Sequence, residues 1–293
     1  MARTSSCLFL ALFGLALSAR SSGDELGLLV SPAELASYMD AHAVRILDAR
    51  RSRIRFRFGH ISQALFLPTD SVFDTVDGVD GRLPSASQVA RAFEEVGIGT
   101  DLPVVVYDDS DGLWAARFFW ALEYLGHDDV HILDGGLRSW KDAGYGASRR
   151  VSDVPESHFE VNVQPNLLIS SETLLEDFDK QGLLLIDTRS PAEYTGKKSF
   201  LKRKGHIPGA MNIDWVENLS NGEGSSFLPL DDLDALYESN GVTRDMNIVT
   251  YCQAGVRAAH AYFALRLLGY EHVALYDDSW EHWGNSDETP VER

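Results

Sequence analysis

The residues best suited to chemistry lie in one short segment, residues 251–257, whose sequence is YCQAGVR. It stands between a β-branched run at residues 248–250 and a helical pattern that starts near Ala258. A strand that turns directly into a helix leaves the first N–H groups of the helix unpaired, and the helix dipole favours negative charge there. A thiolate at Cys252 would be stabilised at this position, with added support from the charge of Arg257. The pattern therefore predicts a nucleophilic cysteine.

The alternative is that Cys252 is a small buried apolar residue, as free cysteines often are. Gly255 and Arg257 argue against it, because a glycine and an arginine flanking a core cysteine are unusual. The spacing Cys-x4-Arg also differs from the Cys-x5-Arg of phosphatases with related architecture, where Ala258 would have to be the arginine. The shorter loop gives a tighter ring of N–H groups, which suits a sulfur atom bonded to the cysteine. Its predicted substrate-binding members are Gln253, Ala254, Gly255, Val256 and Arg257.

The chain repeats itself. Residues 115–140 and 258–283 share a helix, a Leu-Gly ending, a strand and a terminal tryptophan in the same register, and the pairs 47–50 and 186–189 also match. Short apolar runs alternate with amphipathic stretches in each copy, which favours an α/β class with a mainly parallel sheet flanked by helices. The predicted boundaries are a first domain at 23–145, a linker at 146–165 and a second domain at 166–293. Such a long repeat indicates two domains rather than a solenoid.

The two copies differ where the cysteine stands. In the first copy the corresponding turn is one residue longer, so either Asp108 or Asp109 takes the place of Cys252, and Trp114 takes the place of Arg257. A carboxylate there would repel an anionic substrate. We therefore expect the first domain to be inactive and the second to be catalytic.

Four motifs together resemble the rhodanese (thiosulfate sulfurtransferase) superfamily over nearly all of residues 28–283. The loop is similar to that family's active-site loop, residues 205–210 (GHIPGA) and 185–189 (LIDTR) to two further motifs, and residues 276–283 (YDDSWEHW) to its YDGSWxEW signature. Asp278 and His282 depart from that signature. The resemblance implies two tandem rhodanese-like domains, and sulfur transfer through a persulfide on Cys252 without metal or cofactor. It also implies contact between Arg189 and an anionic group of the substrate.

The resemblance leaves the sulfur donor open between thiosulfate and 3-mercaptopyruvate. In mercaptopyruvate-specific relatives an arginine follows the Asp-x-Arg arginine by four residues; here that residue is Glu193. A two-arginine fork for a carboxylate is thereby weakened, which favours thiosulfate or a similar anionic donor. The acceptor would be a thiol, cyanide or a sulfur carrier. A phosphatase or arsenate reductase, and a non-catalytic persulfide carrier or sensor, are the other classes to separate by assay.

The 293-residue chain has a formal net charge of −18. We therefore do not expect it to bind nucleic acid, whose phosphates are also negatively charged. Two basic segments stand out against it: Arg50, Arg51, Arg53, Arg55 and Arg57, and then Lys197, Lys198, Lys202, Arg203 and Lys204. If both line the cleft between the domains, they would concentrate an anionic donor. The histidines show no metal-ligand spacing, and His60 and His206 are interpreted as structural.

The N-terminus has the outline of a secretory signal peptide, predicted at residues 1–22. Arg3 precedes an apolar run from Cys7 to Leu17, and small residues follow. The run is too short for a stable membrane span. We therefore expect an exported protein, periplasmic or secreted, in which cleavage leaves Cys252 as the single cysteine and no internal disulfide can form.

Overall fold

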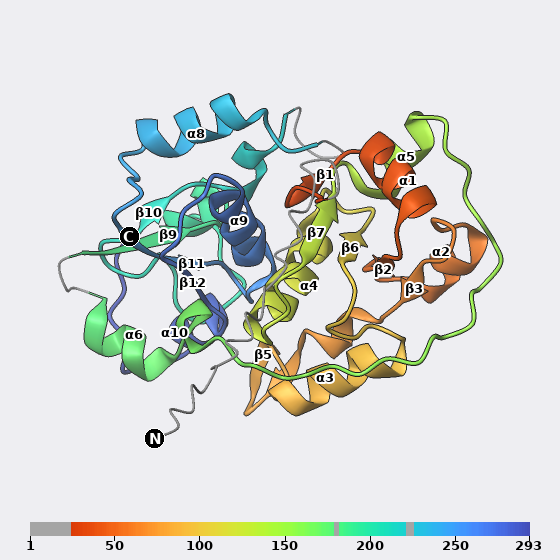
Figure 1. The fold of residues 1–293 in the computed structure, drawn as a ribbon. Helices are drawn as coiled ribbons and strands as arrows, with labels where there is room; N and C mark the ends of the chain where they lie inside the picture. Colours follow the sequence, from red (N-terminus) through yellow and green to blue (C-terminus); the bar gives the residue numbers. More distant parts are fainter. Residues whose placement is uncertain (1–24, 179–181, 221–225) are drawn as a thin grey trace, which may run out of the picture.

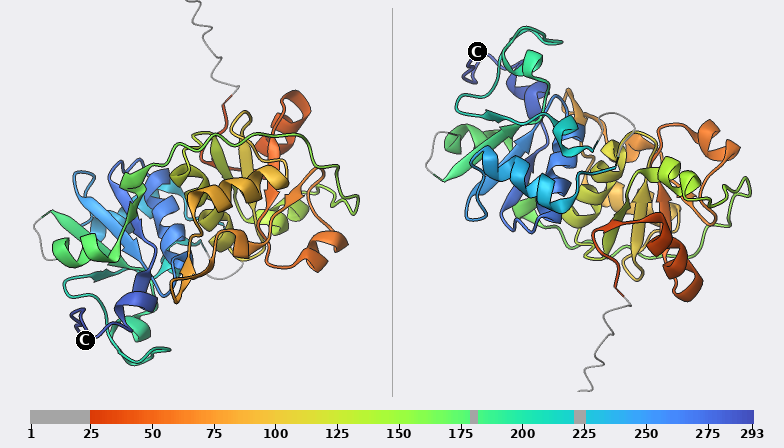
Figure 2. Two further views of the ribbon diagram at one scale, coloured as in Figure 1. Left: turned by 90° about the horizontal axis from the view of Figure 1, so that it is seen from below. Right: turned by 90° about the horizontal axis from the view of Figure 1, so that it is seen from above.

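A computed structural model describes residues 25–178, 182–220 and 226–293, in two α/β units that lie side by side (Figures 1 and 2). The predicted signal peptide lies outside the described residues. Each unit contains a five-stranded parallel sheet, in the order β1-β7-β6-β2-β3 and β8-β12-β11-β9-β10. The two orders are the same when strands are matched along the chain. This confirms the predicted tandem α/β architecture.

The strands are short, as the apolar runs of the sequence require. In the first unit they are β1 (Leu29–Val30), β2 (Arg45–Asp48), β3 (Leu65–Phe66), β6 (Val104–Tyr107) and β7 (Val130–Leu133). In the second they are β8 (Leu168–Ile169), β9 (Leu183–Asp187), β10 (Met211–Asn212), β11 (Asn247–Tyr251) and β12 (Val273–Tyr276). Central β6 and β11 carry Val104 to Tyr107 and Ile248 to Tyr251 with almost no exposed surface, as expected where helices cover both faces.

Helices flank both sheets (Figure 1). The first unit has α1 (Pro32–Ala41), α2 (Arg53–Phe58), α3 (Ala86–Glu95), α4 (Leu113–Tyr124), α5 (Gly136–Asp142) and the 3-10 turn η1 (Thr69–Ser71). The second has α6 (Ser171–Asp177), α7 (Pro191–Tyr194), α8 (Leu230–Ser239), α9 (Val256–Leu267), α10 (Ser279–Trp283) and the 3-10 turns η2 (Pro165–Leu167) and η3 (Trp215–Asn218). Among the described residues, no helix is long and apolar enough to cross a membrane.

Local capping signals account for several helix ends. The N-caps Ser31 and Ser170 accept hydrogen bonds from the backbone of Glu34 and Thr173, which satisfies N–H groups that a helix leaves open. Gly126 and Gly269 follow the C-caps of α4 and α9 in the left-handed conformation, with φ values of 95° and 83°. The central helices α4 and α9 therefore end at matching points.

The two units share one core along α4 and α9. The rings of Phe119 and Phe263 meet edge to face across the boundary, with centroids 4.8 Å apart. An antiparallel hairpin, β4 (Asp74–Val76) with β5 (Val79–Arg82), extends the first unit toward the second. Gly81 lies so close to Ala254 that a Cβ on it would stand 2.6 Å from the Cβ of Ala254. The first domain therefore contacts the loop of the predicted nucleophile directly.

Candidate active site

Cys252 lies where the sequence predicts it, between the end of β11 and the start of α9. Gly255 is the N-cap of α9 and adopts the left-handed conformation (φ 79°), which lets the chain turn from strand to helix within four residues. Cys252 is only 1% exposed. Its side chain is therefore buried beneath the surface of the protein.

Hydrogen bonds to the first residues of α10 fix the conformation of the loop. The hydroxyl of Ser279 accepts the N–H groups of Cys252 and Gly255, each at 3.2 Å, and donates to the carbonyl of Tyr276 at 2.9 Å. The backbone N–H groups of Trp280 and Glu281 donate to the carbonyls of Cys252 and Gln253 at 2.9 and 2.8 Å. These bonds fix the conformation of the loop without using the thiol.

The predicted ring of N–H groups is only partly open to a ligand. The N–H of Gly255 is bonded to Ser279, and that of Val256 donates to the carbonyl of Ala254 at 3.1 Å. Across the described part of the chain, no acceptor is recorded for four N–H groups of the turn, those of Gln253, Ala254, Arg257 and Ala258. These four can bind an anionic sulfur, aided by the positive end of α9.

Arg257 is engaged by a carboxylate. Its two terminal nitrogens donate to the two oxygens of Glu193, both at 2.9 Å, and Glu193 is 4% exposed. Burial would raise the pKa of Glu193, but the hydrogen bonds from Arg257 and Ser190 lower it to about 2. Burial acts to lower the pKa of Arg257, but Glu193 and the nearby Cys252 raise it above its usual value. The cation nearest the nucleophile is thus held in a bidentate ion pair.

The equivalent turn of the first domain contains its own anion. Tyr107 and Tyr251 occupy the same register position, opposite Asp48 and Asp187, so Asp108 and not Asp109 corresponds to Cys252. The carboxylate of Asp108 accepts four backbone N–H groups at 2.8–3.2 Å, from Ser110, Gly112, Trp114 and Ala115. Burial nevertheless raises the pKa of Asp108, and the four bonds oppose that rise. The first position of this turn therefore carries a carboxylate instead of a thiol, and that carboxylate already binds four of its N–H groups.

Comparison with known proteins agrees with this pairing of domains. The sequence matches the family described as Rhodanese-like domain twice, over residues 31–143 and 170–286. The chain belongs to the rhodanese family. It is 35% identical to the sulfur carrier protein TtuD of Thermus thermophilus, over 90% of this chain and 95% of the relative. It is 31% identical to the thiosulfate sulfurtransferase of Pseudomonas aeruginosa, over 92% and 98% of the two chains.

Solved structures carry the same fold. The crystal structure of the 3-mercaptopyruvate sulfotransferase SseA of Escherichia coli has a TM-score of 0.78 with this chain at 30% identity, covering 87% of this chain and 99% of that one. A structure of EanB in complex with ergothioneine reaches a TM-score of 0.80 at 22% identity, which shows the fold alone.

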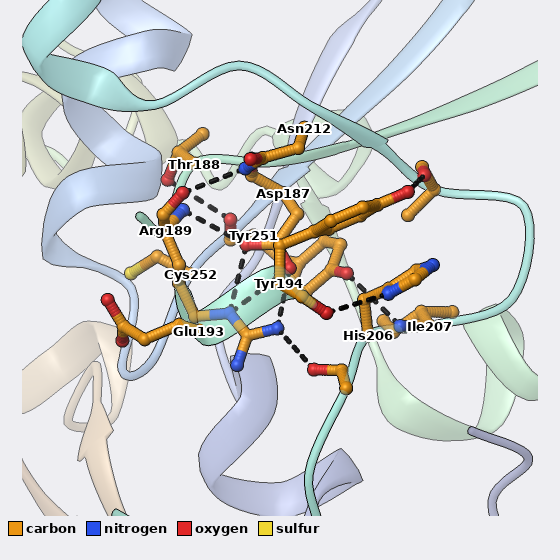
Figure 3. Close-up of polar contacts among 12 residues, drawn as sticks. Asp187, Thr188, Arg189, Glu193, Tyr194, His206, Ile207, Asn212, Tyr251 and Cys252 are labelled. Atoms are coloured by element: carbon orange, nitrogen blue, oxygen red, sulfur yellow. Dashed lines mark hydrogen bonds and ion pairs between the residues drawn. The ribbon is translucent and has the colours of Figure 1, made fainter. Parts of the chain in front are cut away.

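Arg189 has a different environment from the one its motif predicts. It is 2% exposed and donates to both oxygens of Asp187 at 2.6–3.1 Å (Figure 3). It also donates to the carbonyl of Gly205 at 2.8 Å, and its guanidinium lies 4.5 Å from the centroid of the Trp280 ring. Arg50 makes the same bonds to Asp48 and Gly59 in the first rhodanese domain, which has no nucleophile. The described bonds hold Arg189 inside its own domain, and its contact with the donor stays a prediction.

Histidines near the site are structural, as predicted. His206 stacks on Tyr194, with ring centroids 3.6 Å apart, and its Nδ1 lies 2.9 Å from the carbonyl of the same residue (Figure 3). His60 stacks in the same way on Phe56 in the first domain. Among the described residues, no group of three or more histidine, cysteine, aspartate or glutamate side chains could hold a metal ion.

The basic segments do not line the boundary between the domains as expected. Three arginines of the first segment, Arg53, Arg55 and Arg57, lie on α2 at the outer end of the first domain (Figures 1 and 2). Its Arg50 is buried against Asp48. In the second, Lys202 pairs with Asp287 at 2.9 Å and Arg203 donates to the carbonyl of Thr289 at 2.6 Å. Those two contacts join the segment to the C-terminal part of its own domain.

Two contributors to the site were missed from the sequence. Ser279 carried no predicted role, although its motif was recognised, and Glu193 was considered only as the absence of an arginine. A third contribution comes from the other domain: Arg117 of α4 donates to Asp277 at 2.6 Å, just before Ser279. The capping-box spacing Ser190 to Glu193 placed Glu193 in a first turn, but nothing in the sequence joined it to Arg257.

Proposed function

We propose that this rhodanese is a sulfurtransferase that takes the outer sulfur of thiosulfate onto Cys252 and passes it to a nucleophilic acceptor. The observation that carries the proposal is the contrast between the two turns. In the first domain a carboxylate accepts the N–H groups of Trp114 and Ala115, whereas in the second the equivalent N–H groups of Arg257 and Ala258 have no acceptor among the described residues and a cysteine stands in place of the aspartate. The names of relatives at 30–35% identity support sulfur transfer in general.

The reaction proceeds in two balanced steps. The Cys252 thiolate attacks the outer sulfur of thiosulfate, a sulfur–sulfur bond forms, and the original sulfur–sulfur bond breaks with its electron pair leaving on sulfite. The terminal persulfide anion is stabilised by the four open N–H groups of the turn. An acceptor such as cyanide then attacks the outer sulfur and leaves as thiocyanate, which restores the thiolate. A covalent intermediate of this kind gives ping-pong kinetics.

Thiosulfate is favoured over 3-mercaptopyruvate because the position that would complete a carboxylate fork is anionic. Glu193 occupies it and already engages both terminal nitrogens of Arg257. A second carboxylate from the donor would have to compete with Glu193 for the same guanidinium. The relative of Escherichia coli named 3-mercaptopyruvate sulfurtransferase, 30% identical over 88% of this chain, keeps that donor as the alternative.

A sulfur carrier is the second candidate. The relative named sulfur carrier protein is 35% identical over 90% of this chain, which is the observation in its favour. A carrier would accept one sulfur on Cys252 and retain it until a partner arrived. A sulfurtransferase would instead turn over with a small acceptor.

One assay separates these functions. Purified protein is incubated with thiosulfate and cyanide, thiocyanate and sulfite are measured, and the same protein is tested with 3-mercaptopyruvate. We expect repeated turnover and a higher kcat/KM for thiosulfate. A single sulfur adduct without turnover would favour the carrier, and a higher kcat/KM for 3-mercaptopyruvate would refute the donor assignment.

A further inference from the structure

An exposed cluster of arginines lies at the outer end of the first domain, and the proposed sulfur transfer makes no use of it. Residues 147–150 run beside the end of α2, where His60 and Ser148 form a β-bridge and Arg149 donates to the carbonyl of Phe58 at 3.3 Å. This contact brings together two basic segments that are about ninety residues apart in the sequence. We define the arginine patch by its exposed members Arg51, Arg53, Arg55, Arg57, Arg149 and Arg150.

The patch also exposes large apolar side chains. Ile54 and Phe58 are 69% and 73% exposed and stand one helical turn apart on α2, while Phe56 between them is buried at 4%. Side chains four residues apart lie on the same face of a helix, so the two apolar groups point outward together. Val151, next to Arg150, is 58% exposed. Such an arrangement is costly in water and marks an interaction surface.

The charge of the patch is opposite to that of the chain. Six arginines stand against one carboxylate with which an ion pair is described, that of Asp109, 3.0 Å from Arg55, whereas the whole chain has a formal net charge of −18. At physiological ionic strength, charges more than about 8 Å away are largely screened, so a ligand at this end would experience mainly the patch. The complementary ligand is anionic.

We propose that the arginine patch binds the surface of an anionic phospholipid bilayer. Guanidinium groups bind phosphate through paired hydrogen bonds, and their aliphatic stems can lie along the apolar boundary while Ile54 and Phe58 insert. A stable protein interface buries about 800 Å² on each partner around an apolar centre. Two side chains on a six-residue helix provide little of that area, but they suffice to anchor a basic segment in a headgroup layer.

The test is co-sedimentation of the full chain with vesicles of phosphatidylcholine, with or without phosphatidylglycerol. We expect the bound fraction to rise when phosphatidylglycerol is present and to fall again with added salt. The variant R53Q/R57Q should weaken binding to the anionic vesicles roughly tenfold or more, since each arginine or lysine near an anionic surface contributes about 1 kcal/mol to binding. A separate variant, Phe58→Ser, should also weaken binding to the anionic vesicles, but without changing the salt dependence of that binding.

The matched control is R91Q/K141Q, which removes two exposed cations of the same domain outside the patch. It should bind as the wild type does. The apolar run at residues 7–17 is present in every variant, so differences between variants report the patch alone. Thiosulfate turnover and thermal unfolding should be unchanged in R53Q/R57Q, which shows that the fold is intact.

Two results would overturn the proposal. One is equal binding to vesicles with and without phosphatidylglycerol. The other is loss of binding in the control variant to the same extent as in R53Q/R57Q. If the wild type ignores anionic vesicles but is retained on immobilised poly-glutamate, and R53Q/R57Q is not, the patch binds an acidic protein instead.

Discussion

The two domains build the same strand-turn-helix from different residues, and they fill it differently. In the first, Asp108 directs a carboxylate into the turn and binds four N–H groups; in the second, Cys252 places a thiol there and leaves equivalent N–H groups open. The cradle is therefore a property of the fold. The residue at the first position of the turn decides whether the N–H groups bind a carboxylate of the chain itself or stay open for a ligand.

A second contrast runs across the domain boundary. Arg117 and His260 are the fifth residues of α4 and α9, and each reaches toward the turn of the opposite domain. Arg117 is fully buried and donates to the carbonyls of Val72 and Gly81 and to Asp277. His260 stacks on Phe227 and has its Nε2 3.2 Å from the carbonyl of Asp111; burial lowers its pKa to about 3, so it is neutral. Between these two equivalent helix residues, it is the turn with the nucleophile whose domain receives a cation from its neighbour, while the first turn faces a neutral histidine.

Exchanging the residue at the first position should have the largest effect. Both Cys252→Ser and Cys252→Asp should lose at least about a thousandfold in thiocyanate production, because neither can form the persulfide. Cys252→Asp should fold normally, since its carboxylate can take up the N–H groups as Asp108 does. Intact-mass spectra after thiosulfate treatment should show one added sulfur in the wild type and none in either variant. Residual turnover in Cys252→Ser would disprove the mechanism.

Removing the support that crosses the boundary should have the next largest effect. Arg117→Met should lower kcat roughly a hundredfold, because the segment 277–279 that holds the loop would shift by a fraction of an ångström to an ångström. It should also lower stability by about 3–5 kcal/mol, since Asp277 is left buried without its partner. Arg117→Lys should restore part of both quantities.

The matched control is Arg266→Met, which breaks another ion pair between the domains, that of Arg266 with Glu123 at 3.1 Å. Neither of these two residues belongs to the loop of the nucleophile or to the segment 277–279 that holds it. It should cost on the order of 1 kcal/mol and leave kcat within a factor of about two. Equal losses of kcat in Arg117→Met and Arg266→Met would mean that docking of the domains, not positioning of the loop, limits activity.

Glu193→Gln should have an intermediate effect, visible mainly in the pH dependence of stability. The folded pKa of Glu193 is lowered to about 2, so its contribution is complete above its unfolded pKa of about 4.3 and is lost as the pH falls toward 2. The contribution is at most about 3 kcal/mol. The free energy of unfolding in urea should therefore be larger for the wild type than for the variant at neutral pH. The difference should shrink as the pH falls from about 4.3 toward 2. A constant difference across that window would contradict the assignment.

The smallest effect should come from the second basic segment, residues 197–204. Lys202 and Arg203 bind the C-terminal part of their own domain, so we expect only Lys197, Lys198 and Lys204 to attract the donor. Changing these three to glutamine should raise KM for thiosulfate about two- to threefold without changing kcat, since they act on encounter. The difference should disappear in molar salt, where the Debye length is about 3 Å. A difference that persists there would exclude steering.

The sequence was sufficient for the architecture because its signals are local. The alternation of apolar runs with amphipathic stretches can be recognised over a few residues at a time in both copies, and the structure reproduces it as the strands and helices of two equivalent units. The same holds for the turn at Cys252, where Gly255 marks the start of the helix. The predicted fold class and the predicted strand-to-helix turn at Cys252, which depended on such local patterns, were therefore confirmed.

The contacts that complete the site could not be predicted, because they join distant residues. Ser279 reaches Cys252 across 27 positions and Arg117 reaches Asp277 across 160. The sequence assigned both Arg189 and Arg257 to the site. The structure shows that Arg189 is paired with Asp187 inside the fold, whereas Arg257, in the loop of the nucleophile, is paired with Glu193. The choice between Asp108 and Asp109 needed the strand register, because the first turn is one residue longer.

The burial of Cys252 also sets a size limit on the reagents that can modify it. At 1% exposure the thiol should react with small alkylating agents such as iodoacetamide and resist bulky maleimides. A sulfur–sulfur bond is about 2 Å long, so loading with sulfur moves the nucleophilic atom to a new place without any movement of the backbone. We expect the loaded and unloaded proteins to differ in which alkylating agents label them, which would make labelling a direct measure of the sulfur-loaded fraction.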